Sequence, residues 1–119
     1  MGSKHYSKVM QTQLVVLQGD IRQLNVDAKA LDLTEDTATA YRKALLRAKS
    51  DNARSIAFPC VSFGNNPSGA AEVALKTVRD FLSENPGTFS EVIFACWDTE
   101  NYKLYKAMLG GENRVINIP

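Results

Sequence analysis

The sequence predicts an α/β domain in which helices sandwich a largely parallel sheet. Three apolar runs, at residues 14–17, 55–61 and 91–97, are typical of buried strands. Segments with helical spacing of apolar residues separate the later strands and follow the last one. Such alternation is typical of parallel strands joined by helical crossovers. We therefore expect a compact three-layer α/β/α sandwich with a mostly parallel sheet of about four strands.

The N-terminal part of the chain predicts one clear strand and one weak strand. The run at 14–17 is stopped by Gly19-Asp20, which is typical of a strand that ends in a turn. Residues 21–26 are long enough for a single helical turn. Residues 27–33 lack β-branched and aromatic side chains, so they predict at most a short strand.

The next segment predicts a helix with Thr34 as its N-cap. Two acidic residues follow Thr34, and the helix macrodipole favours acids in a first turn. Ser50-Asp51-Asn52 ends the helix. Its cations are Arg42, Lys43, Arg47 and Lys49. They suggest either a solvated helix surface, which is the commoner case, or contact with nucleic acid.

Residues 55–67 combine a strand with a polar loop that contains Gly64 and ends at Pro67. Apolar helical spacing starts at Ala70 and stops at residues 85–87. A strand, a polar loop and a helix start leave backbone N–H groups free to bind an anion. The same residues also suit an ordinary strand-to-helix connection.

The C-terminal part predicts a buried strand at 91–97 and a third helix after it. Asp98 or Thr99 is the expected N-cap, and Gly110-Gly111 is the expected C-cap. Residues 115–118 suit either a last short strand or a mobile tail.

Composition predicts one domain over residues 1–119, with residues 1–8 disordered or derived from a tag. The 119 residues are 45% apolar and carry a net charge of +1, which gives no global electrostatic reason to bind nucleic acid. We find no hydrophobic signal segment and no apolar run of membrane-spanning length. We therefore expect a soluble, intracellular protein, cytoplasmic or nuclear.

The cysteines and the single histidine argue against several kinds of chemistry. Cys60 and Cys96 each lie in an apolar run, so we expect two buried, reduced thiols. No zinc-type spacing is present, and we expect no metal and no cofactor. His5 lies in a polar N-terminal stretch, which disfavours a catalytic triad.

Three polar strand ends carry the candidate ligand site. They are residues 19–21, 62–66 and 97–98, each directly after an apolar strand. In parallel sheets, ligands bind beyond the carboxyl ends of the strands. If these strands are neighbours, the three ends meet at one rim.

The sequence resembles the macro domain, an α/β module that binds ADP-ribose. Residues 14–21 with Val26-Asp27-Ala28 resemble the family's first strand and its "GDI…VDA" signature. Residues 55–64 resemble the "SIAFPAISTG" strand and phosphate loop. Residues 70–78 resemble the helix that follows it, and residues 91–105 the last strand and the C-terminal helix.

The chain departs from the family pattern directly after Ala28. There the family has an Asn-rich stretch, a Gly-rich loop, a helix and two further strands, whereas this chain proceeds at once to the helix near Thr34. The ribose-binding asparagine and the glycine loop that wraps the diphosphate have no counterpart. The loop after Gly64 is also shorter than in the family and lacks its aromatic-Gly pair.

The resemblance implies a set of ligand-binding residues and no catalytic ones. Asp20 would accept a hydrogen bond from the adenine amino group, the Ile21 backbone would contact the same base, and Trp97 would pack on it. The phosphate loop would consist of Ser62, Phe63, Gly64, Asn65 and Asn66. Each has a plainer alternative: Asp20 as a turn residue, Trp97 as a core or edge aromatic, and the loop as a turn.

The resemblance therefore implies a degenerate, non-catalytic module that binds ADP-ribose or an adenine nucleotide weakly. The alternative is an engineered or derived minimal scaffold without a ligand, which acts as a structural or interaction domain. Loss of strands from one side exposes a sheet edge, so a homodimer through that edge, or a swap of residues 27–34, is expected. We expect no nucleic-acid and no membrane partner.

Overall fold

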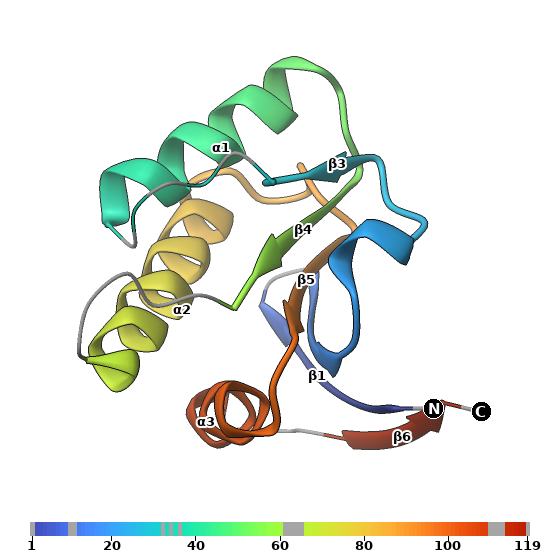
Figure 1. The fold of residues 1–119 in the computed structure, drawn as a ribbon. Coiled ribbons are helices and arrows are strands. Elements are labelled where there is room, and N and C mark those ends of the chain that lie inside the picture. Colours follow the sequence, from blue (N-terminus) through green and yellow to red (C-terminus); the bar gives the residue numbers. More distant parts are fainter. Residues whose placement is uncertain are drawn as a thin grey trace.

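The computed structural model describes residues 2–9, 12–31, 33, 35, 37–60, 66–109 and 114–118. The described residues form a sheet of six strands in the order β3-β4-β5-β2-β1-β6 (Figure 1). The central apolar runs form β2 (Thr12–Gln18), β4 (Ser55–Pro59) and β5 (Glu91–Cys96), which are parallel neighbours. The short β3 (Ala28–Lys29) pairs in parallel with β4. The predicted α/β fold with a mostly parallel sheet is confirmed.

Two antiparallel strands make the sheet larger than the four strands we expected. β1 (Gly2–Val9) forms a hairpin with β2, and β6 (Arg114–Ile118) pairs with β1. Residues 2–8, which we expected to be disordered or derived from a tag, are part of a strand. The physical reason is that β2 is an apolar strand whose second edge needs backbone hydrogen-bond partners. Of the two alternatives for residues 115–118, the structure has the strand.

The described residues form three α-helices, α1 (Ala38–Ser50), α2 (Pro67–Glu84) and α3 (Thr99–Leu109). Thr37 caps α1, because its hydroxyl accepts the Ala40 N–H at 3.2 Å, and the predicted cap, Thr34, lies outside the described residues. Asn66 caps α2 by accepting the Gly69 N–H at 3.0 Å, so α2 begins three residues before the predicted Ala70. No described helix combines the length and the hydropathy that a membrane span requires.

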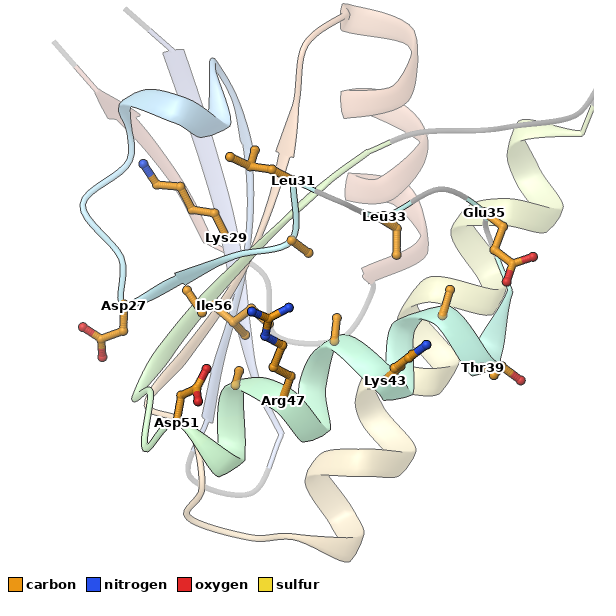
Figure 2. A pocket seen from close by; sticks show the side chains of 15 residues that line it. Asp27, Lys29, Leu31, Leu33, Glu35, Thr39, Lys43, Arg47, Asp51 and Ile56 are labelled. Carbon is orange, nitrogen blue, oxygen red and sulfur yellow. The ribbon is translucent and has the colours of Figure 1, made fainter.

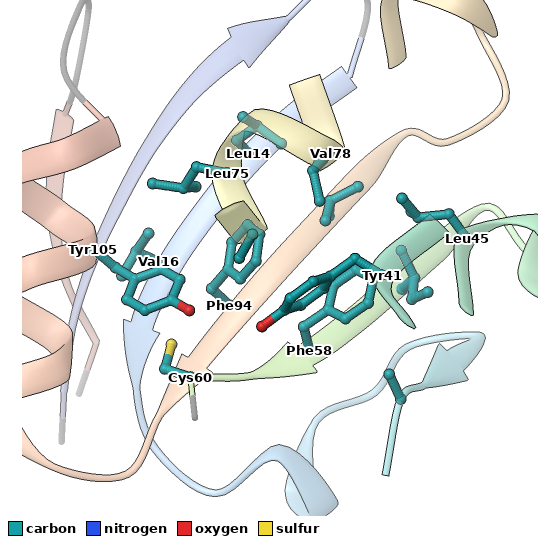
Figure 3. Close-up of a cluster of buried hydrophobic side chains, with 14 of the residues drawn as sticks. Leu14, Val16, Tyr41, Leu45, Phe58, Cys60, Leu75, Val78, Phe94 and Tyr105 are labelled. Atoms are coloured by element: carbon teal, nitrogen blue, oxygen red, sulfur yellow. The ribbon is translucent and has the colours of Figure 1, made fainter. Parts of the chain in front are cut away.

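The main core lies between the three α-helices and one face of the sheet (Figure 3). Alternate residues of a strand point to opposite faces, so Leu14 and Val16 belong to this core. A row of aromatic rings crosses it from α1 over β4 and β5 to α3. The row consists of Tyr41, Phe58, Phe94 and Tyr105, whose successive ring centroids lie 5.3, 5.7 and 5.3 Å apart.

The opposite face of the sheet has a thinner cover. Val15, Leu17, Ala57, Ile93 and Ala95 are buried there. Their cover in the described residues is a single helical turn, η1 (Ile21–Gln23), with its flanking loop, through Ile21, Leu24 and Val26. The second helical layer that the sequence predicted is therefore reduced to this 3₁₀ turn, which follows directly from the end of β2.

Candidate functional site

The carboxyl ends of β4, β5 and β2 lie side by side and form the rim that the sequence predicted. Gly19 donates its N–H to the Cys96 carbonyl at 3.0 Å, which joins the end of β2 to the end of β5. Cys60 donates its N–H to the Ala95 carbonyl at 3.1 Å, which joins β4 to β5. Asp20 and Trp97 therefore follow neighbouring strands at the same edge.

Asp20 is held in a turn by a set of hydrogen bonds from Arg22. The Asp20 Oδ1 accepts the Arg22 backbone N–H at 2.9 Å and its Nε–H at 3.1 Å. The Oδ2 atom accepts from a terminal guanidinium nitrogen at 3.0 Å. The Arg22 side chain, followed by its backbone N–H, holds the pKa of the Asp20 carboxyl below its usual range. The carboxylate also raises the pKa of Arg22. Asp20 is therefore ionised at neutral pH.

A lysine from β3 holds the same turn from the other side. Lys29 donates from Nζ to the Arg22 carbonyl oxygen at 2.8 Å. Its charge acts in the same direction as that of Arg22 on the pKa of Asp20, as a smaller contribution. One carboxylate and two cations thus meet at this corner of the rim, and Lys29 was not among the residues predicted from the sequence.

Trp97 leaves the end of β5 and points into solvent. Its exposed fraction is 74%, which excludes the core role that a lone tryptophan after a buried strand suggested. The following Asp98 accepts the Asn101 N–H and starts α3. Gln18 at the end of β2 donates to the Thr99 hydroxyl at 3.0 Å, which ties α3 to the strand before Asp20.

Asn66 is the described part of the predicted phosphate loop. It lies at the N-terminus of α2, where unpaired N–H groups and the helix macrodipole favour an anion. Ser62, Phe63, Gly64 and Asn65 lie outside the described residues. Ile21 opens η1 and packs against the second face of the sheet.

The two cysteines form a disulfide, which corrects the prediction of two reduced thiols. Cys60 directly follows β4, and Cys96 is the last residue of β5. Because the two strands are parallel neighbours in register, their ends bring the Cα atoms to 4.7 Å. That lies within the range that a disulfide requires. The bond joins the strand ends that lead to residues 61–65 and to Trp97.

A groove lies between the β3 edge of the sheet and α1 (Figure 2). Its volume is about 710 Å³, and both apolar and charged side chains line it. Figure 2 shows Asp27 and Asp51 at one end, Glu35 at the other, and Lys43 and Arg47 between them on α1. Among the described residues, no group of three or more His, Cys, Asp or Glu side chains could hold a metal ion.

Comparisons with known proteins agree with this fold and with the sequence motifs. No family model matches the chain. A solved Oceanobacillus iheyensis macrodomain with ADP superposes with a TM-score of 0.79, covering 92% of this chain and 96% of that one, at 17% identity. The chain has the macrodomain fold. A Trypanosoma brucei macrodomain in complex with ADP-ribose is 35% identical over 61% of this chain and 33% of that one, with a TM-score of 0.56.

Curated relatives extend the similarity to named enzymes. An O-acetyl-ADP-ribose deacetylase of Cronobacter sakazakii is 38% identical over 76 residues, which are 61% of this chain and 42% of that protein. The human ADP-ribose glycohydrolase MACROD2 is 38% identical over 77 residues, 60% of this chain and 18% of that protein. The aligned part of this macrodomain-like chain thus spans less than half the length of these relatives. The resemblance to a shortened macro domain is confirmed.

Proposed function

We propose that the rim binds ADP-ribose or an adenine nucleotide, weakly and without catalysis. The observation that supports this most is the placement of Asp20 and Trp97 on neighbouring strand ends, joined by the Gly19–Cys96 hydrogen bond. An ionised carboxylate beside an exposed aromatic ring suits a base that carries an exocyclic amine. Macrodomains with the same fold have been solved with ADP and with ADP-ribose.

In the proposed mode, each group has one task. Asp20 accepts a hydrogen bond from the adenine amino group, and the Ile21 backbone contacts the base. Trp97 packs on the base, and such stacking contributes about 1–3 kcal/mol. Asn66 and residues 62–65 receive the phosphates at the N-terminus of α2. The affinity is low because the glycine loop that wraps the diphosphate in the family has no counterpart in this sequence.

Catalysis is not part of the proposal. Asp20 has a lowered pKa, so it is ionised at neutral pH and does not suit the role of general acid. The deacetylase and glycohydrolase activities named for the relatives belong to proteins of which the alignments cover 42% and 18%. The chain lacks the block on which, by resemblance, the family's catalysis depends.

Isothermal titration with ADP-ribose and with AMP tests this function. We expect measurable binding of both by the native protein and its loss in Asp20→Ala. Asp80→Ala is the matched control, because Asp80 is an ion-paired carboxylate on α2 that forms its bond to Lys76 away from the rim. Equal affinity for the two ligands would mean that only the base and its proximal phosphate are held. If the folded protein shows no detectable binding of either ligand, the proposal is refuted.

The groove beside β3 favours a second candidate, an interaction domain without a ligand. β3 pairs only with β4 among the described strands, and Leu31 beside it is 58% exposed. A second copy of the chain is the partner we expect. Contact would go through the exposed β3 edge of the sheet, with the exposed Leu31 beside it. Sedimentation at high concentration tests the dimer. We expect a dimer mass for the native protein and a monomer mass for Leu31→Glu. A monomer mass for the native protein would refute this candidate.

We expect no nucleic-acid binding through α1. Arg42 forms an ion pair with Glu84 at 2.9 Å, and Lys49 donates to the Asn85 side chain at 2.7 Å. Such pairs favour the solvated helix surface over a phosphate-binding face. Salt-dependent retention of the protein on heparin would contradict this expectation.

A further inference from the structure

We propose that Arg22 competes with the ligand for Asp20 and thereby lowers the affinity of the rim for adenine. The inference rests on the proposed function, because it concerns the carboxylate that would accept the adenine amine. Arg22 lies in η1, which begins directly after Asp20. The resemblance gives Asp20 the role of accepting the adenine amine and gives Arg22 no role. When no ligand is present, the Arg22 guanidinium would occupy the Asp20 carboxylate in place of the adenine amine.

The hydrogen bonds of Asp20 leave little room for a further donor. An ionised carboxylate offers about four acceptor positions, two on each oxygen. Arg22 takes both positions on Oδ1, with its backbone N–H at 2.9 Å and its Nε–H at 3.1 Å. It takes one on Oδ2, at 3.0 Å. A ligand amine must use the single remaining position or displace the guanidinium.

The guanidinium can leave without disturbing the turn. The Arg22 side chain is 71% exposed, whereas its backbone is held by two independent bonds: its N–H to Asp20 and its carbonyl to Lys29. If the side chain turns into solvent, the backbone N–H still orients the carboxylate. Two acceptor positions, one on each oxygen, then become available at the rim.

The competition should be weak and sensitive to salt. Exposed ion pairs are screened by salt, and a surface pair of this kind changes an equilibrium by at most about fivefold. Removal of the guanidinium should therefore tighten binding of the base by about two- to fivefold. A phosphate group would obscure this effect, because Arg22 would also attract an anion.

Adenosine, which has no phosphate, is therefore the probe. We expect Arg22→Ala to bind adenosine about two- to fivefold more tightly than the native protein. Arg22→Lys should lie between them, since an ammonium makes a point contact in place of a two-pronged one. Raising NaCl from about 0.1 M to about 1 M should bring the native affinity toward that of Arg22→Ala, because the Debye length falls from about 10 Å to about 3 Å. The affinity of Arg22→Ala should change little.

Arg42→Ala is the matched control, since it also removes an arginine from a carboxylate, at Glu84. It should leave adenosine binding unchanged. A second readout needs no ligand: the pKa of Asp20, followed by carboxyl carbon NMR, should rise in Arg22→Ala.

Native protein that binds adenosine as tightly as Arg22→Ala, or more tightly, would overturn the competition and leave the proposed function standing. An Asp20 pKa that Arg22→Ala does not change would also overturn it. Failure of both folded proteins to bind adenosine or ADP-ribose would overturn the proposed function and the competition together.

Discussion

Loss of the Cys60–Cys96 disulfide should destabilise this protein more than any single surface change. The bond closes a loop with a sequence separation of 36. For n = 36, the chain-entropy relation gives a loss of about 13 cal/mol/K from the unfolded chain, or about 4 kcal/mol at 25 °C. That is a large fraction of the 5–15 kcal/mol by which domains are typically stable. With about 2.1 cal/mol/K of unfolding entropy per residue over 119 residues, Tm should fall by about 15 °C.

Thermal unfolding followed by circular dichroism, with and without a dithiol reductant, measures this change. The Cys60→Ala/Cys96→Ala variant is the control, because reductant should leave its Tm unchanged. Its Tm should lie near that of the reduced native protein, somewhat lower for the lost side-chain volume. A native Tm that reductant does not alter would refute the reasoning. Detection of two reactive thiols in protein denatured without reductant would also refute it, because the disulfide would then be absent.

Three further perturbations test the caps, the rim and the core. Asn66→Ala removes the side chain that accepts the Gly69 N–H and should cost about 1 kcal/mol in urea unfolding; an unchanged midpoint would contradict the assigned cap. Because the folded protein keeps Asp20 ionised to lower pH than the unfolded chain does, its contribution to stability is present above about pH 4 and is lost as the pH falls below that. Asp20→Asn should reduce this acid dependence, and a stability-against-pH curve identical to the native one would contradict it. Phe94→Ala opens the centre of the aromatic row, where Phe94 is fully buried, and should cost about 3–5 kcal/mol; a loss below about 1 kcal/mol would contradict its core position.

The sequence was sufficient for the strand order along the chain and for the position of the rim. Apolar runs identify β2, β4 and β5, because strands buried on both faces need continuous hydrophobic segments. Helix starts were less certain. Thr34 and Thr37 are both suitable caps by residue type, and the hydrogen bond donated by the Ala40 N–H identifies Thr37 as the cap. Asn66-Pro67 was assigned to a ligand loop, although an N-cap followed by proline is also a helix start.

The features missed from the sequence depend on neighbours distant in the chain. The disulfide requires the register of β4 against β5, which brings Cys60 and Cys96 to one sheet end from 36 positions apart. β1 forms because β2 has an open edge, and its own composition did not predict it. The Arg22–Asp20 pair could have been predicted, because an arginine two residues after a turn aspartate is a local signal. Its three hydrogen bonds join Arg22 in η1 to Asp20, the N-cap of η1.

Trp97 offers the most direct test of the rim as an adenine site. It is the only tryptophan in the chain and is 74% exposed, so tryptophan emission, excited at a wavelength that the four tyrosines do not absorb, reports on this position alone. Titration with ADP-ribose should give a saturable change in Trp97 emission, and Asp20→Ala should lose it while Asp80→Ala keeps it. Emission that stays constant in folded native protein, at ligand concentrations up to the millimolar range, would contradict the proposed site.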